Sequence, residues 1–141
     1  MRTRSQQYSQ KVFEQIDAVE KTNIFSDDKM KKQYGSLCHN FPIMVLQNGL
    51  SQAVAFLWIK AKDKEKENSP QGVFLKHLSA ITSGKEGESP ADFQQRINMA
   101  PLAQYQQLTR QILAASIWYK RFAESILGVK AGNQEESNDD D

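Results

Sequence analysis

The stretch Phe41–Lys60, FPIMVLQNGLSQAVAFLWIK, is the most hydrophobic segment of the chain, and its spacing predicts a helix over Pro42–Lys62. Proline lacks a backbone N–H and restricts the residue before it, so Pro42 should separate this helix from one that ends near His39. One side of the predicted helix is apolar and should face the core. It carries Ile43, Leu46, Leu50, Ala53, Val54, Leu57 and Ala61.

A second side of this helix is polar but carries no charge. A solvated face normally carries Lys and Glu, so an uncharged one indicates a surface covered by another helix or another protein. Gly49 costs roughly 0.5–1 kcal/mol relative to alanine in a helix interior, which is tolerable where another backbone passes closely. Two interpretations stay open: packing within the molecule, or a subunit interface. The candidate interface residues are Gln47, Asn48, Ser51, Gln52 and Trp58.

The rest of the chain also carries helix signals. Thr3 and Gln6 fit a capping box, before apolar positions at helical spacing, and Ser26 can cap a second helix. Ser69-Pro70 and a capping box over Ser89–Asp92 start two more. Pro101 opens the longest helix, of about 27 residues, with Gly128 as its C-cap. The expected inward-facing residues are Tyr8, Val12, Ile16, Val19, Phe74, Leu78, Ile81, Tyr105, Leu108, Ile112, Ala115, Tyr119, Ala123 and Ile126.

These signals predict an all-α fold, a compact bundle of five to six helices with a long C-terminal helix. A length of 141 residues suits one domain, which we place at 1–128, followed by an acidic disordered tail at 129–141. No apolar run is long enough to span a bilayer, and the N-terminus has no apolar stretch of signal-peptide type. We therefore expect a cytoplasmic protein without membrane contact.

The charge is unevenly distributed along the chain. The formal net charge is +1, but five of the 17 acidic side chains lie in the last nine residues, so the body is basic. Such asymmetry is typical of proteins with an anionic partner, and a solvated surface with a solubilising tail is the alternative. On the last helix, Arg110, Ala114, Ile117 and Arg121 share the side opposite the core, flanked by Lys120. They could hold a phosphate backbone or a partner subunit, or form an ordinary solvated face.

Signals for catalysis are weak. Cys38 and His39 are adjacent, but neighbours on a helix point about 100° apart, so a buried structural thiol is favoured over a nucleophile pair. A metal site needs more ligands, and His77 is the only other histidine. The sequence has no glycine-rich phosphate loop and no Gly-x-Ser-x-Gly motif. We expect no cofactor, no metal and no enzymatic activity of the chain by itself.

Two stretches, YGSLCHNFPIMVLQNGLSQAVAFLWIK and YQQLTRQILAASIWYKRFAES, carry a family resemblance. The first resembles a pattern with Asn-Gly-Leu-x-Gln followed by Ala-Phe and a lysine. The second resembles Leu-Thr, Leu-Ala and Trp-x-Lys-Arg-Phe-Ala. Both occur in this order in the small subunit of Cmr-type (type III-B) CRISPR effector complexes, and the type III-A small subunit is a close relative. The acidic tail departs from the family core.

The resemblance implies a structural role. Several copies of the small subunit stack head to tail beside the backbone subunits, along CRISPR RNA paired with target RNA, in a complex that also contains a large subunit. Cleavage of invading RNA belongs to the backbone subunit, so this chain would be non-catalytic. Its RNA-binding candidates are Lys60, Arg110, Lys120 and Arg121. The alternatives are a helical protein-binding adaptor without RNA contact, a small DNA-binding regulator, and an enzyme.

Overall fold

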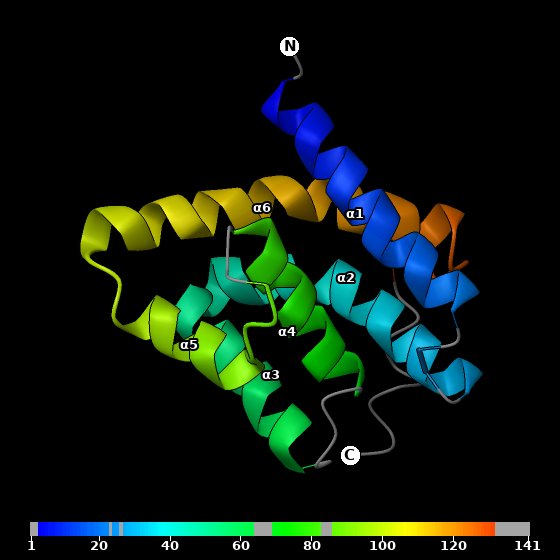
Figure 1. Ribbon diagram of the computed structural model, residues 1–141, viewed down its shortest axis with the longest axis horizontal. Coiled ribbons are helices and arrows are strands. Elements are labelled where there is room, and N and C mark those ends of the chain that lie inside the picture. The colour runs from blue at the N-terminus through cyan, green and yellow to red at the C-terminus, as the bar shows by residue number, and fades with distance from the viewer. Residues whose placement is uncertain (1–2, 23, 26, 64–68, 83–85, 132–141) are drawn as a thin grey trace.

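The fold is that of a computed structural model, which describes residues 3–22, 24–25, 27–63, 69–82 and 86–131. These residues form helices and no strand (Figure 1), which confirms the predicted all-α class. The longest helix is the last, with 24 residues. The six helices are α1 (Arg4–Lys21), α2 (Asp28–Asn48), α3 (Leu50–Asp63), α4 (Pro70–Ile81), α5 (Pro90–Asn98) and α6 (Leu102–Ser125).

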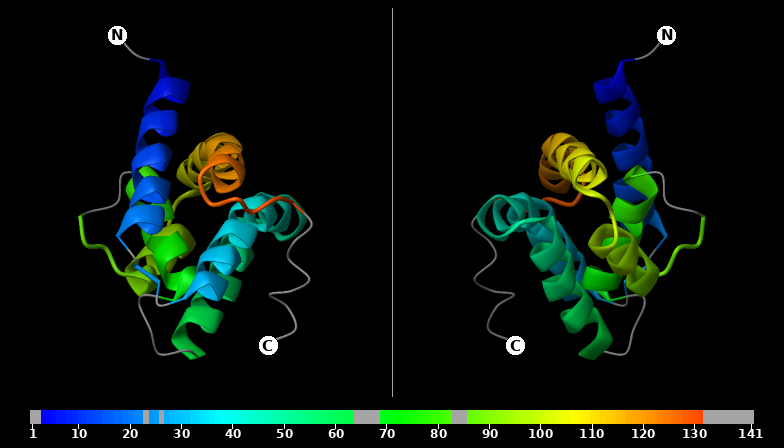
Figure 2. Two further views of the ribbon diagram at one scale, coloured as in Figure 1. Left: turned by 90° about the vertical axis from the view of Figure 1, so that its right-hand side faces the viewer. Right: turned by 90° about the vertical axis from the view of Figure 1, so that its left-hand side faces the viewer.

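The helices surround α4, which is buried on most of its circumference. In Figure 1, α6 spans one side of the molecule, α1 crosses its second half, and α3 and α5 lie below its first half. Both views of Figure 2 place α6 at one side of the bundle and the end of α3 at the opposite side. The predicted inward residues of α4, Phe74, Leu78 and Ile81, are buried.

An aromatic cluster fills the centre of the core. The rings of Tyr34, Phe41 and Tyr119 meet the Phe74 ring with centroids 5.7, 5.3 and 5.4 Å away, in the edge-to-face geometry that aromatic pairs favour. A buried hydroxyl needs a partner, and both tyrosines have one. Tyr119 donates to Gln15 Oε1 at 2.5 Å, and the Tyr34 hydroxyl is hydrogen-bonded to His77 Nδ1 at 2.6 Å. The core therefore ties α1, α2, α4 and α6 together by both packing and hydrogen bonds.

The helix starts follow the sequence signals closely. The Thr3 side chain accepts from the Gln6 N–H at 3.0 Å, and Gln6 Oε1 accepts from the Thr3 N–H at 2.7 Å, so the capping box is confirmed. Ser69 and Ser89 cap α4 and α5, each followed by a proline, although only the serine half of the predicted box is present at Ser89. Ser26 lies outside the described residues, and Asp27 is the cap of α2.

The predicted helix boundary at Pro42 is wrong. Helix α2 continues through Pro42 to Asn48, and the break falls at Gly49, which joins α2 to α3. A proline inside a helix costs about 3 kcal/mol, and burying a large apolar side chain returns roughly 1.5–3 kcal/mol. Phe41 and Val45, on either side of Pro42, are both buried. The continuous helix is therefore favoured because it buries both of them.

Gly49 has φ 88° and ψ 157°, a backbone region that is essentially restricted to glycine. An added Cβ would meet only the Tyr105 hydroxyl, at an ordinary contact distance of 3.5 Å. The glycine is thus required by its conformation, and a close approach of another backbone does not explain it. Because α2 continues to Asn48, its buried face is the one that carries Phe41 and Val45, and Ile43 and Leu46, predicted to be buried, are 49% and 73% exposed. The other predicted core residues of this stretch, Leu50, Ala53, Val54, Leu57 and Ala61, are buried.

The end of α6 also differs from the prediction. The helix ends at Ser125, three residues before Gly128, which has φ 73°. Val129 is then buried, and its N–H donates to the Ala123 carbonyl at 3.0 Å. The packed chain therefore extends past the predicted boundary at 128. Of the predicted inward residues of α6, Tyr105 and Ile126 are half-buried and the others are buried. Residues 132–141, most of the predicted tail, lie outside the described residues.

Candidate subunit and nucleic-acid surfaces

The α2–α3 junction is bonded to the junction between α5 and α6. The Ser51 N–H, at the start of α3, donates to the Tyr105 hydroxyl at 2.9 Å. The Ser51 hydroxyl donates to Asn98 Oδ1 at 2.5 Å. Ser51 was a candidate interface residue, yet it ties helices together within the molecule. Packing within the molecule is therefore the interpretation that fits this part of the uncharged face.

The other polar candidates of this face point to solvent. Gln47, Asn48 and Gln52 are exposed, and because Gly49 separates α2 from α3, Asn48 and Gln52 do not belong to one helix. Three apolar side chains at the same two junctions are also strongly exposed: Leu46 (73%), Met99 (72%) and Leu102 (72%). The right-hand view of Figure 2 faces this side of the molecule. We call these six residues the charge-free end: Leu46, Gln47, Asn48, Gln52, Met99 and Leu102.

Trp58 and Lys60 lie further along α3. Trp58 is half-buried and packs against the core, so only part of its ring is available to a partner. The Lys60 ammonium lies over the Phe56 ring, 5.4 Å from its centroid, as a cation–π pair. Lys60 is near the end of α3, on the side of the bundle away from α6 (Figure 2). The structure therefore does not bring Lys60 together with the other three RNA-binding candidates.

The outer side of α6 presents the remaining basic candidates. Arg110, Lys120 and Arg121 are all exposed. The Arg121 guanidinium lies 5.2 Å from the centre of the Trp118 ring, and that ring stacks on Phe122 at 5.9 Å. A guanidinium held against an aromatic ring keeps its N–H groups available for phosphate oxygens. Ala114 and Ile117 are exposed between the two arginines, as predicted.

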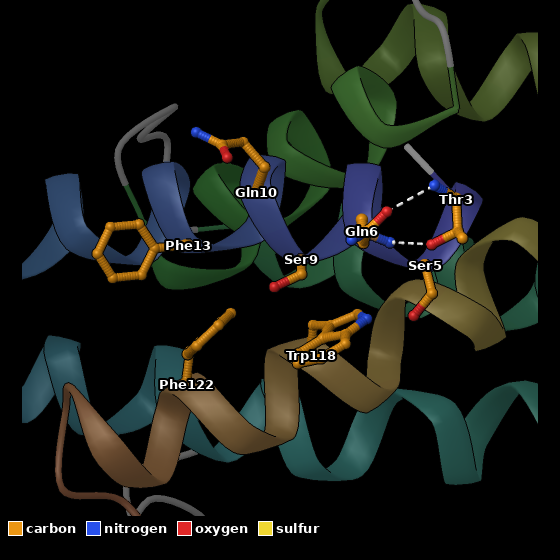
Figure 3. Close-up of a pocket in the computed structure, with 8 residues that line it drawn as sticks. All are labelled: Thr3, Ser5, Gln6, Ser9, Gln10, Phe13, Trp118 and Phe122. Carbon is orange, nitrogen blue, oxygen red and sulfur yellow. Dashed lines mark hydrogen bonds between the residues drawn. The ribbon is translucent and has the colours of Figure 1, made fainter. Parts of the chain in front are cut away.

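A groove between α1 and α6 was not predicted from the sequence. It has a volume of about 470 Å³ and is drawn in Figure 3, with Ser5 and Ser9 pointing from α1 toward Trp118 and Phe122 on α6. Phe13, 44% exposed, closes one end by packing edge-to-face on Phe122 at 5.6 Å. The one available signal was Phe13 itself, an aromatic residue beside the predicted apolar stripe of its helix. The groove is lined by Thr3, Ser5, Gln6, Ser9, Gln10, Phe13, Trp118 and Phe122.

The reactive side chains are built into the core. Cys38 is buried, and burial raises the pKa of its thiol well above the usual range, so the thiol is protonated. The His39 side chain is hydrogen-bonded through Nε2 to the Val129 carbonyl at 2.8 Å. Burial, followed by the positive charge of Lys76, lowers the pKa of His77 to about 4, so this imidazole is neutral at pH 7. The predicted structural role of Cys38 agrees with its burial.

Neither a metal site nor a membrane-spanning helix is found in the part of the chain that the structure describes. No cluster of three or more His, Cys, Asp or Glu side chains there is suited to hold a metal ion. Within the same residues, no helix combines the length and the apolar character needed to cross a bilayer. The surfaces that remain as candidates for function are the charge-free end, the basic side of α6 and the α1–α6 groove.

Comparisons with known proteins identify relatives over nearly the whole folded region. The family described as CRISPR-associated protein (Cas_Cmr5) matches residues 4–126. The CRISPR system Cmr subunit Cmr5 of Thermus thermophilus is 32% identical over 127 residues, which cover 90% of this chain and 98% of the relative. The crystal structure of a CRISPR-associated Cmr5 family protein from the same organism superimposes with a TM-score of 0.67 at 30% identity, over 89% of this chain and 98% of that one.

Proposed function

The chain belongs to the CRISPR-associated Cmr5 family, and from this premise we propose that it is a stacking, RNA-contacting small subunit of a Cmr-type ribonucleoprotein. The resemblance that the motifs indicated is thereby confirmed, and its partners lie within the Cmr complex. In our proposal several copies stack along CRISPR RNA paired with target RNA, beside the backbone and large subunits. The complex acts in the cytoplasm, and this chain supports its cleavage of invading RNA.

The charge-free end is the observation that carries the stacking proposal. A lone exposed leucine is ordinary, but three strongly exposed apolar side chains among uncharged amides are the composition of an interface centre. Each amide keeps hydrogen-bonding groups that a partner must satisfy, which favours one defined contact over non-specific association. The interface proposal is therefore best supported for Gln47, Asn48 and Gln52. Ser51 holds this surface in place through its hydrogen bonds to Tyr105 and Asn98.

The basic side of α6 is the proposed RNA contact. Arg110 and Arg121 are 11 residues apart in sequence, which places them about 16 Å apart along the helix axis. The contact should involve the RNA backbone rather than bases, because guide sequences differ and phosphates carry no sequence information. Lys60 lies on the opposite side of the bundle and is a weaker candidate. We propose that it contacts a different segment of the RNA or another subunit.

We further propose that the chain contributes no catalytic group of its own. A nucleophilic cysteine needs a thiolate and access to substrate, whereas the Cys38 thiol is buried and protonated. His39 is buried and hydrogen-bonded to the backbone, and the His77 ring is hydrogen-bonded to the Tyr34 hydroxyl. The active sites of the complex would then belong to other subunits.

The RNA contact is tested by charge reversal in the assembled complex. In the double variant Lys120→Glu/Arg121→Glu we expect unchanged assembly and capture of target RNA weakened by roughly tenfold at physiological salt, because phosphate contacts dominate such affinity. The slope of log affinity against log salt should fall by about two, one for each lost contact. Capture is measured with the tagged chain by pull-down and sequencing of the co-purified RNA, and by titration of labelled target RNA.

A matched control separates local contact from net charge. Lys32→Glu/Lys130→Glu changes the total charge by the same amount at exposed positions on other parts of the surface. Equal losses in both double variants would mean a general charge effect. Full RNA capture by Lys120→Glu/Arg121→Glu in an intact complex would instead favour the helical adaptor that binds only protein.

A further inference from the structure

The charge-free end and the α1–α6 groove lie far apart on the same long helix. Leu102 begins α6, and Trp118 of the groove lies 16 residues later, about 24 Å along the helix axis. Figure 1 shows the first turn of α6 at one edge of the molecule and α1 crossing the helix near its other end. One molecule therefore cannot fold its own charge-free end into its own groove. Any contact between the two surfaces must join different molecules.

The two surfaces are chemically complementary. Aromatic rings from both helices line the groove, Phe13 from α1 and Trp118 and Phe122 from α6, and its α1 wall also carries hydroxyls and amides. None of the lining residues is charged, although the Arg121 guanidinium lies over the Trp118 ring. The charge-free end presents leucine and methionine side chains among amides, also without charge. A contact between the uncharged lining residues and the charge-free end avoids most of the desolvation of ions, which is a large penalty when charged residues are buried. Arg121 is exposed and can keep its guanidinium in contact with solvent at the edge of the groove. Methionine also packs favourably against aromatic ring edges, which suits Met99 against these rings.

The size of the groove suits whole side chains. Its volume of about 470 Å³ far exceeds the roughly 30 Å³ that one water takes in the liquid. Met99 and Leu102, each 72% exposed, are the apolar groups that project from the α5–α6 junction. They flank the same short junction between α5 and α6, and the hydrogen bonds of Ser51 to Asn98 and Tyr105 hold the amides of the α2–α3 junction next to it. The wall residues available to those amides are Ser5 and Ser9.

We propose that the charge-free end of one copy seats in the α1–α6 groove of the next copy, with Met99 and Leu102 packing on Trp118 and Phe122. This inference rests on the stacking proposed above and adds the surface that receives the charge-free end. The contact is heterologous, because two different patches meet, so it repeats without closing into a twofold dimer. A linear row of copies follows, with one open groove at one end of the row and one open charge-free end at the other.

The test uses paired cysteines in the complete complex. The variant Ser9→Cys/Leu102→Cys carries one new thiol in the groove and one at the charge-free end, with the buried Cys38 left in place. Within a molecule these thiols are too far apart for a disulfide, which needs Cα atoms closer than about 7 Å. The Cmr complex is reconstituted with guide RNA, oxidised or treated with a short bis-maleimide, and examined on denaturing gels. We expect a ladder of dimers and higher multimers of the chain.

Control variants show whether such a ladder depends on the groove. Gln7→Cys/Leu102→Cys places the first thiol at an exposed position of the same helix that does not line the groove, and should yield no ladder. Each single cysteine variant can form at most dimers. Ser9→Cys/Met99→Cys tests the second apolar group of the charge-free end and should repeat the ladder. A copy count by native mass spectrometry on the same complexes accompanies every gel.

The outcomes separate the two proposals. Complexes with two or more copies and no ladder from either groove pair would overturn the groove contact while leaving stacking intact. Complexes with a single copy would overturn stacking itself. Dimers from Ser9→Cys alone would indicate a twofold groove-to-groove contact and contradict the heterologous arrangement. Cross-links from the groove to another Cmr subunit, identified by peptide mass spectrometry, would assign the groove to that subunit and overturn the proposal.

Discussion

At the scale of single residues, His77 shows how burial sets the chemistry of a side chain. Its Nδ1 is hydrogen-bonded to the Tyr34 hydroxyl at 2.6 Å, and the imidazole packs against the same ring. We assign the hydroxyl as the donor. Acceptance at Nδ1 requires the neutral tautomer with its proton on Nε2. Protonation would remove the acceptor and place a positive charge beside Lys76. The histidine therefore belongs to the core network and is not poised for acid–base work at neutral pH.

This residue should make stability depend on pH. The pKa of His77 is lowered from 6.5 to about 4 in the folded chain. Between these values the unfolded chain binds a proton that the folded chain does not, so the free energy of unfolding falls as the pH falls through this window. Above pH 6.5 the contribution is complete. The difference between the two pKa values sets the upper limit of the loss in unfolding free energy. Because His77 is half-buried and keeps some solvent contact, we expect a smaller loss, of about 2 kcal/mol, on reaching pH 4.

The measurement is chemical unfolding at a series of pH values, compared with His77→Asn. Asparagine can place an oxygen near the Nδ1 position for the Tyr34 hydroxyl and does not titrate. The difference in unfolding free energy between the two proteins removes the common contribution of carboxylates. A difference that stays constant from pH 7 to pH 4 would show that the folded and unfolded pKa values of His77 are equal.

At the scale of elements, the segment after α6 is part of the bundle. Val129 packs directly on Gly35 of α2, where an added Cβ would lie 2.6 Å from the valine side chain. The Val129 carbonyl accepts from His39 at 2.8 Å, and Gly128 makes the turn that reverses the chain. Gly35, His39 and Val129 thus close α6 onto α2. We call this contact the C-terminal clasp.

Two truncations should separate the clasp from the acidic tail. We expect removal of residues 132–141 to leave the melting temperature and the unfolding free energy nearly unchanged. Removal of residues 129–141 should cost about 2–4 kcal/mol, because it exposes the site of a buried valine and leaves His39 without its acceptor. Urea unfolding monitored by circular dichroism measures both. Equal stability of the two truncated chains would show that the clasp contributes nothing to the fold.

At the scale of the whole molecule, one core connects all six helices. The cluster of buried side chains includes residues of every helix, from Val12 in α1 to Ala123 in α6. The hydrogen bonds of Ser51 join α3 to α5 and α6 at a distance from this centre. No helix among the described residues therefore has a separate core on which it could persist alone.

This connectivity predicts cooperative unfolding. Trp58 in α3 and Trp118 in α6 report on opposite sides of the bundle, so variants that keep only one tryptophan provide two local probes. We expect both fluorescence transitions and the far-ultraviolet circular dichroism transition to have the same midpoint in urea. The replaced tryptophan is changed to phenylalanine in each case. Separate midpoints for the two probes would mean that α1 and α6 unfold independently of α3.

The fold class, most helix starts and the family can be recognised from local patterns along the chain. Caps and N-terminal prolines act over three or four neighbouring residues, so Thr3, Ser69 and Ser89 could be recognised without the rest of the chain. The family follows from motif order, which is also a property of the linear sequence. The inward-facing residues of α1 and α4 followed from helical periodicity, because these helices have no internal break.

The position of the bend and the set of exposed side chains depend on contacts between distant parts of the chain. The continuation of α2 through Pro42 depends on packing with Phe74, and the bend at Gly49 depends on the bonds of Ser51 to Asn98 and Tyr105. These partners are far away in sequence, beyond any local pattern. Because the bend lies at residue 49 and not at residue 42, Leu46 lies on the solvent side of α2 and belongs to the charge-free end. The α1–α6 groove likewise exists only because two helices from opposite ends of the chain cross.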